Sequence, residues 1–199
     1  MHLLERVPNI ALPMRRGFQF ANFEATLIHS MPTGAHLHLL VNHAPILGSL
    51  FALALLIASY FTSADVLRRL AFVVLIVTAI AGALANFSGE PAEDAIRGFP
   101  GVKRDVIHEH EEMGEKAYYL AAALGVLSLG ALVRWRRRPI PPSAALVAVL
   151  ATAFVGGAMV YTGLLGGRVR HTEVRPGATK DDATAIEPPR QRPPQPAGN

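Results

Sequence analysis

The sequence predicts an all-α integral membrane protein, a four-helix bundle that ends in a disordered, proline-rich C-terminal tail. Two observations predict this fold class. Of the 199 residues, 51% are hydrophobic and only 17% are charged, whereas a soluble domain has about 25% charged residues. The apolar residues also occur in four long blocks instead of short periodic stripes, so too little amphipathic sequence is left to cover them in a soluble protein.

Each apolar block is long enough to cross a hydrocarbon core about 30 Å thick, which needs about 20 apolar residues in a helix. The blocks are predicted to be helices because a spanning segment must satisfy its own backbone hydrogen bonds, and none shows the alternation of a membrane β-strand. Small residues such as Gly82 and Gly125 favour close helix packing. The predicted spans are residues 39–61, 70–87, 117–133 and 144–165.

Two terminal segments flank the predicted membrane domain, which covers residues 36–171. Residues 1–35 lack the continuous apolar core of a signal peptide and are expected to form an interfacial helix or a loop. Residues 172–199 are polar and rich in proline, which predicts an extended or disordered tail. This tail is either solvated or a tether that lies on a neighbouring subunit.

The arginines predict an orientation in a bacterial inner membrane. Arg68 and Arg69 lie between spans one and two, and four arginines occupy 134–138 between spans three and four. Because positive residues in short loops stay in the cytoplasm, both loops are predicted to face inward. Both termini and the loop 88–116, with eight acidic and four basic residues, are then periplasmic. The net charge of +4 gives no reason to expect nucleic-acid binding, because the basic residues concentrate in the short loops and the tail.

Six of the eight histidines are predicted to gather at one membrane face. The starts of spans one and three and the ends of spans two and four lie on the same side, because consecutive spans alternate in direction. Carboxylates accompany the histidines there, and ionisable groups close to membrane depth are costly and therefore functional candidates. The six candidate cofactor-binding histidines are His36, His38, His43, His108, His110 and His171.

A b-type haem is the leading hypothesis for this face. The chain has no cysteine, which excludes thiolate zinc sites, iron–sulfur clusters and covalently attached c-type haem. Two neutral imidazoles from different helices bind haem iron without cysteine. The expected pair is His43 with His108 or His110, while Arg168 and Arg170 would pair with the propionates. Electron transfer within a larger membrane complex would follow.

A non-haem divalent metal site for zinc, copper or iron is the main alternative, because imidazole and carboxylate ligands occur at helical spacing. His108 and Glu112 are four residues apart and share one helix face. The predicted metal ligands are His36, His43, Glu90, Glu93, His108 and Glu112. A non-catalytic accessory subunit and a small transporter are further alternatives, although few charges lie at the span centres. Expected partners are the lipid bilayer and other membrane subunits, and no catalytic residue is assigned.

Four short motifs carry a resemblance to known sequences. They are HLLVNHAPILG at 38–48, SGEPAE at 88–93, IHEHEE at 107–112 and GGRVRH at 166–171. In this order they resemble an uncharacterised family of bacterial four-helix integral membrane proteins. The resemblance implies the same fold and a shared polar cluster at one membrane face, and it implies no activity. Ser88 and Ala44 depart from the threonine and the aromatic residue of that family.

Overall fold

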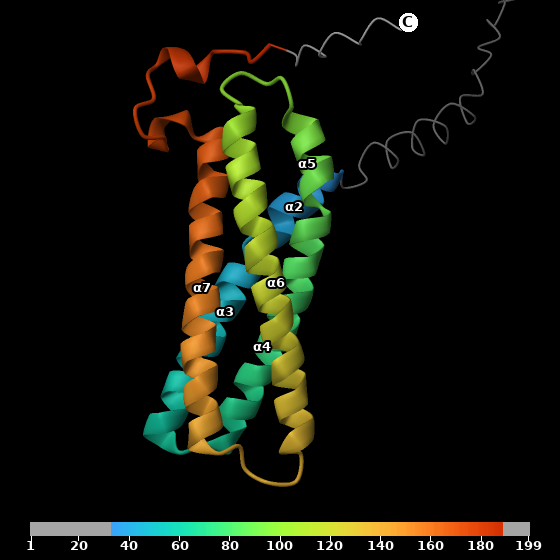
Figure 1. Cartoon of the computed structure of the whole chain (residues 1–199), viewed down its shortest axis with the longest axis vertical. Helices are drawn as coiled ribbons and strands as arrows, with labels where there is room; N and C mark the ends of the chain where they lie inside the picture. Colours follow the sequence, from blue (N-terminus) through green and yellow to red (C-terminus); the bar gives the residue numbers. More distant parts are fainter. Residues whose placement is uncertain (1–32, 189–199) are drawn as a thin grey trace, which may run out of the picture. The chain divides into compact units, whose positions relative to one another are not determined.

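Four long helical segments that run in alternating directions make up most of the computed structural model (Figure 1), which describes residues 33–188. Each segment is long and apolar enough to cross a membrane, and the described residues include no strand. The predicted all-α membrane bundle is thus confirmed. The interfacial helix or loop predicted for the N-terminal extension lies almost entirely outside the described residues, since these begin at residue 33. The four segments are Gly34–Thr62, Asp65–Ile96, Arg104–Arg134 and Pro142–Arg170.

The first two segments are each divided near the same end of the bundle. Helix α2 (Gly34–Val41) gives way to α3 (Ala44–Thr62) at Asn42 and His43. Pro45 lies in the first turn of α3, where a missing backbone N–H costs nothing because it would have no helical partner. Helix α4 (Asp65–Phe87) likewise gives way to α5 (Gly89–Ile96) at Ser88. These two breaks allow α2 and α5 to pack against each other.

The last two segments are continuous helices, α6 (Arg104–Arg134) and α7 (Pro142–Arg170). Helix α6 begins at Arg104, well before the predicted span at 117. The difference arises because hydropathy marks only the apolar part of a helix, and residues 104–116 continue the same helix with polar side chains. The predicted long loop 88–116 therefore consists mostly of α5 and the first turns of α6.

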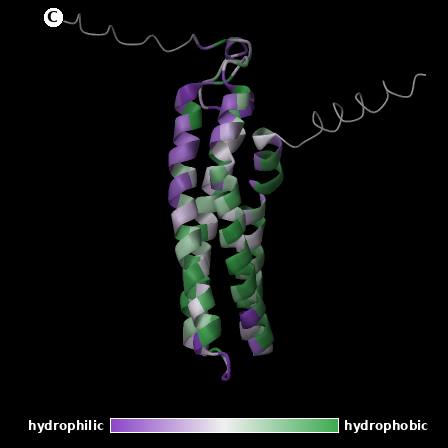
Figure 2. Ribbon diagram, turned by 90° about the vertical axis from the view of Figure 1, so that its right-hand side faces the viewer, coloured by the Kyte–Doolittle hydropathy of each residue, from purple (hydrophilic) through white to green (hydrophobic). Residues whose placement is uncertain are grey.

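Small residues let the helices approach closely. Helix α4 packs against α3 and α6, and α7 packs against the same two helices, so the four form a ring around one core. A Cβ placed on Gly125 of α6 would lie only 2.5 Å from the Cβ of Ala79 on α4. Figure 2 shows that hydrophobic residues fill the middle of the bundle and that hydrophilic residues concentrate toward its ends. The exposed leucines, valines and phenylalanines of the middle thus form a lipid-facing surface.

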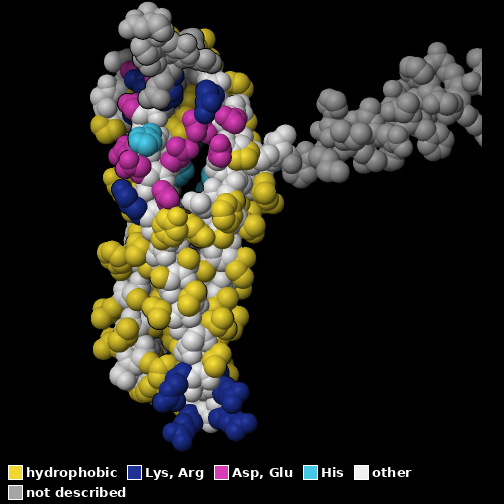
Figure 3. Space-filling view, turned by 45° about the vertical axis from the view of Figure 1, so that its right-hand side comes forward, with side chains coloured by type: hydrophobic (Ala, Val, Ile, Leu, Met, Phe, Trp, Pro, Cys, Tyr) yellow, Lys and Arg dark blue, Asp and Glu magenta, His cyan; other side chains and the backbone are white. Residues whose placement is uncertain are grey.

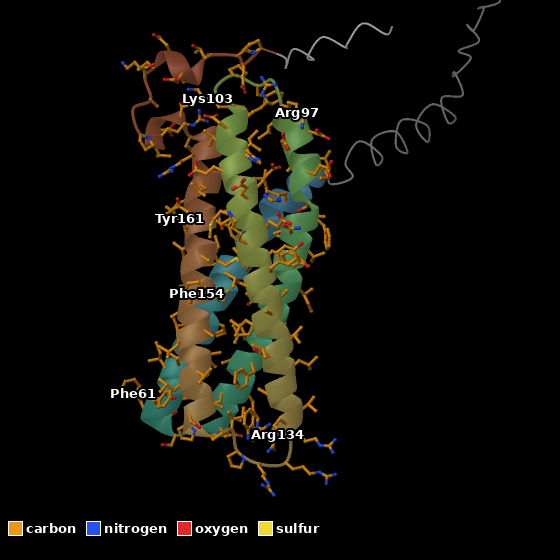
Figure 4. The ribbon with its side chains drawn as sticks, viewed as in Figure 1. Phe61, Arg97, Lys103, Arg134, Phe154 and Tyr161 are labelled. Carbon is orange, nitrogen blue, oxygen red and sulfur yellow. The ribbon has the colours of Figure 1, made fainter. Side chains whose placement is uncertain are left out.

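The two ends of the bundle differ in charge. Lysine and arginine mark one end, and Asp, Glu and His side chains gather toward the other, as Figure 3 shows. Arg134 lies in the basic end, and Arg97 and Lys103 lie at the opposite end (Figure 4). The sequence prediction that histidines and carboxylates share one membrane face agrees with this arrangement.

The C-terminal segment after α7 folds against the start of α6. It contains two short 3-10 helices, Thr172–Val174 and Asp181–Ala183. Lys103 Nζ donates to Asp182 at 2.6 Å, and Gly101 N donates to Ala185 O at 2.9 Å. Residues 172–188 therefore have a defined conformation, which proline-rich composition did not indicate because these contacts are specific pairs of distant residues. Residues 189–199 of the predicted tail lie outside the described residues.

Candidate functional site

Two of the candidate histidines point into the bundle, and the first is His38 on α2. The ring is partly buried, and its Nδ1 lies 3.0 Å from the carbonyl oxygen of Ala85 and 3.2 Å from Ser88 Oγ. The Ser88 hydroxyl also donates to Ala85 O, at 3.1 Å. The break between α4 and α5 at Ser88 is therefore the place where α2 is attached through His38.

His110 is the second inward-facing histidine, and it lies on the core-facing side of α6. Ile107, Ala117 and Ala121 are buried on the same side, at the three- and four-residue steps that define one helix face. His110 Nδ1 lies 3.1 Å from Thr162 O on α7. Its ring packs on Gly166, where a Cβ would lie 2.9 Å from His110 Cε1. Glycine at position 166 therefore provides the space that the imidazole occupies.

These contacts determine which ring nitrogen of His38 and His110 carries the proton. A backbone carbonyl oxygen only accepts hydrogen bonds, so Nδ1 of each neutral ring must be the donor. The Nε2 atoms are left with their lone pairs, and neither has a hydrogen-bond partner among residues 33–188. Histidines that bind metals typically have this arrangement, with one nitrogen held by a carbonyl and the other free.

The other four candidate histidines are exposed. His36 forms a capping interaction with Thr33 at the start of α2, and His43 precedes α3 at the helix break. The side chain of His108 is 72% exposed and lies 3.2 Å from Glu112. His171 follows α7 and lies 2.9 Å from Glu173. Of the expected haem pair, only the alternative with His110 includes an inward-facing ring.

The predicted metal ligands do not form one cluster. Within residues 33–188, no three His, Asp or Glu side chains come together in a way that would hold a metal ion. Glu93 pairs instead with Arg97 at 3.0 Å, and Glu112 lies between His108 and Lys116. Glu90 is exposed in the first turn of α5. These three carboxylates therefore pair with neighbouring basic side chains or face solvent, and they do not join the histidines in a metal site.

The two candidate arginines lie near the end of α7, beside the C-terminal segment. The carbonyl oxygen of Arg168 accepts from Arg175 Nε at 2.6 Å. The guanidinium of Arg170 lies 5.9 Å from the centre of the Phe99 ring. A surface pocket of about 240 Å³ is lined by Arg168, Arg175 and Lys103 among others. This pocket is formed by the C-terminal segment, and neither inward-facing histidine lines it.

The partners of the two histidines were not candidates at the sequence level. Ala85 and Thr162 contribute backbone carbonyls, which no side-chain pattern reveals. The seven-residue spacing of His110, Ala117 and Leu124 would have placed His110 on the core-facing side of α6, since all three follow the helical period. Each of the four short motifs at 38–48, 88–93, 107–112 and 166–171 supplies one residue to this site, namely His38, Ser88, His110 and Gly166.

Acidic side chains gather around a hollow at the polar end of the bundle. Figure 3 shows Asp and Glu side chains around a hollow in which histidine atoms are visible. The side-chain oxygen of Asn42, at the break between α2 and α3, is buried without a hydrogen-bond partner among the described residues.

Comparison with protein-family models, curated proteins and solved structures found no match.

Proposed function

We propose that this protein is an integral membrane electron-transfer subunit that binds a b-type haem through His38 and His110. The observation that carries the proposal is the state of the two rings. Each donates Nδ1–H to a backbone carbonyl on another helix and presents an Nε2 that has no hydrogen-bond partner within residues 33–188. Bound haem would supply one-electron chemistry at its iron.

The number of suitable ligands favours haem over a bare metal ion. The porphyrin supplies four nitrogens, so a haem needs at most two histidines, whereas a zinc ion needs three or four protein ligands. The described residues offer two inward-facing imidazoles and no group of three metal ligands. A non-haem metal held by the exposed set around His108 and Glu112 is the second candidate, supported only by their 3.2 Å contact.

The residues around the two rings would orient and tune the site. The carbonyls of Ala85 and Thr162 hold the rings in one tautomer and increase the electron density on Nε2, which strengthens it as a ligand. Ser88 shares the Ala85 carbonyl with His38 and so restricts rotation of that ring. Gly166 keeps space for His110. The family resemblance fits this site, because all four motifs contribute to it.

The charge distribution supports a location in a bacterial inner membrane with the histidine end toward the periplasm. Arg134 and the three arginines at 136–138 lie at the opposite end from most of the carboxylates, and positive residues in short loops stay in the cytoplasm. Thr33 and the segment 172–188 would then both be periplasmic. An electron-transfer subunit needs a donor and an acceptor, so we propose that it works within a larger membrane complex.

Absorption spectroscopy of single variants tests the proposal. Full-length protein produced with added haem precursor and purified in detergent is expected to show a Soret band and reduced-state bands after dithionite. His38→Ala and His110→Ala are expected to abolish or shift these bands. His43→Ala and His108→Ala are matched controls on exposed histidines of the same segments and should retain them.

Two results would overturn this assignment. Wild-type protein without a Soret band, although haem was supplied during production, would exclude the haem proposal. Loss of the bands in the two control variants but not in His38→Ala and His110→Ala would move the ligands to the exposed histidines. Elemental analysis of the same preparations distinguishes iron in haem from a stoichiometric non-haem metal, which would support the second candidate.

A further inference from the structure

The basic end of the bundle is a short loop, 135–141, that joins α6 to α7. Hydrogen bonds from side chains at the start of α4 hold its backbone in place. Arg68 is only 7% exposed and donates to Ile140 O at 2.8 Å, while Asp65 accepts from Ile140 N at 2.7 Å. Arg69 donates to the carbonyls of Trp135 and Arg138 at 2.9 and 2.7 Å. The loop is therefore a rigid platform built on the first turn of α4.

Four arginine side chains project from this platform. Arg134, Arg136, Arg137 and Arg138 are all exposed, and no ion pair involves any of them within residues 33–188. Asp65 is the acidic residue of this end, and it is already occupied by Arg69 at 2.6 Å and by Ile140 N. The platform thus presents four positive charges without a neutralising partner among the described residues.

The place of these arginines in the bundle determines what they meet. They lie directly beyond the apolar middle of the bundle, as the basic end of Figure 3 shows. Basic residues that border an apolar span meet the lipid headgroups. Trp135 lies beside them, 5.9 Å from the Arg134 guanidinium, and tryptophan is typical of membrane–water interfaces. A guanidinium binds a phosphate with two parallel hydrogen bonds, and arginine does so better than lysine.

We propose that this arginine platform binds the phosphodiester headgroups of anionic phospholipids in the adjoining leaflet. The loop backbone is already held by Asp65, Arg68 and Arg69, so binding orders only the exposed side chains. Several guanidiniums then share the headgroups of the surrounding annulus. The proposal depends on neither the haem nor the orientation of the protein, because either leaflet can supply an anionic lipid.

Native mass spectrometry of the full-length protein tests the proposal. The protein is equilibrated in neutral-detergent micelles with equal fractions of phosphatidylglycerol and phosphatidylcholine that have the same acyl chains. Wild type is expected to retain phosphatidylglycerol preferentially. Each basic residue near an anionic surface contributes about fivefold to affinity, so Arg136→Gln/Arg137→Gln/Arg138→Gln should weaken retention by on the order of a hundredfold at low salt. Added salt should weaken wild-type retention in the same direction.

A charge-matched variant at the other end is the control. Arg97→Gln/Lys116→Gln/Lys180→Gln also removes three positive charges and should retain the lipid preference. The platform variant should keep wild-type helicity, because the side chains of residues 136–138 make no hydrogen bond among the described residues. The control variant should keep it as well, because Arg97 and Lys116 form only exposed ion pairs within single helical segments. Equal retention of both lipids by wild type would overturn the proposal, and so would an equal loss of phosphatidylglycerol retention in both variants. Thermal stabilisation of the protein by inorganic phosphate that equals its stabilisation by phosphatidylglycerol would also overturn it.

Discussion

The imidazole of His110 packs against the backbone of Gly166, where a Cβ would come within 2.9 Å of His110 Cε1. The same ring donates to Thr162 O, one helical turn before Gly166 on α7. Position 166 therefore controls where the ring of His110 can lie. Neighbouring Gly167 has no atom within 4 Å of an equivalent Cβ, so the two glycines form a natural comparison.

Gly166→Ala is expected to displace the His110 ring from Thr162 and to destabilise the protein by about 1–3 kcal/mol, the usual cost of overpacking. Gly167→Ala should be neutral or stabilising by about 0.5–1 kcal/mol, because alanine lowers the entropic cost of a helical glycine. Thermal unfolding in detergent measures both. If bound haem is present, its spectrum should change in the first variant alone. Equal melting temperatures for the two variants would contradict the proposed packing of His110 against Gly166.

Gly125→Ala is expected to separate α4 from α6. The new Cβ would lie 2.5 Å from the Cβ of Ala79. A Cβ is fixed to its backbone and cannot rotate away, so the helices must move apart at a cost of about 1–3 kcal/mol. Gly130→Ala is the control on the same helix, because its Cβ would have no neighbour within 4 Å. A lower melting temperature is expected only for Gly125→Ala, and a similar loss at position 130 would contradict this account.

Arg68→Met is expected to destabilise the basic end. The substitution preserves the buried apolar stem but removes the bond to Ile140 O and the 3.3 Å bond to Ser59 Oγ. Loss of a hydrogen bond from a charged donor costs about 1.5–3 kcal/mol. Arg137→Met removes the same charge from an exposed position and should change the free energy of unfolding in neutral detergent by less than about 0.5 kcal/mol. Equal effects would show that Arg68 is not a structural anchor.

Acid is expected to release the C-terminal segment from α6. Lys103, together with Thr179, holds the pKa of Asp182 well below its usual value, and the backbone N–H of Arg104 lowers the pKa of Glu187. Carboxyls with lowered pKa values stabilise the docked segment above about pH 4, the unfolded value, and this stabilisation is lost as the pH falls toward the lower folded values. Docking should therefore weaken below about pH 4.

Hydrogen exchange of the Gly101 amide reports this release, because that amide donates to Ala185 O. After correction for the intrinsic rate, exchange should increase below about pH 4. Asp182→Asn should increase it already at neutral pH, whereas Asp181→Asn, at an exposed neighbour, should leave it unchanged. Protection that persists at low pH would show that the ion pairs do not hold the segment.

The membrane bundle was predictable from residue order alone, while parts of its helices were not. Hydropathy located all four spans but missed the polar start of α6 at 104–116 and the short helix α5, because both lie beyond the apolar core. Pro45, in the first turn of α3, is a local signal for the helix break at Asn42 and His43. The break at Ser88 also has a local signal, because Gly89 and Pro91 follow directly and both residue types mark helix ends.

The sequence predicted at which membrane face the candidate site lies, but it did not predict the contacts within the site. The histidines indeed gather at one end, yet the expected emphasis on His43 and His108 differs from the structure, in which these rings are exposed and His38 and His110 point inward. Spacing relates residues within one helix only. Spacing carries no information about which face meets a neighbouring helix. The contacts with the carbonyls of Ala85 and Thr162 could therefore not be predicted.

The order of the residues determined the number of spans, their alternating direction and the separation of an arginine end from a histidine end. These properties follow from solvation, because apolar blocks partition into lipid and charged groups remain outside. Only the tertiary structure decided the tautomers of His38 and His110, the seat on Gly166 and the rigid arginine platform. Each of these depends on atoms of helices that are far apart in the chain and meet only through packing.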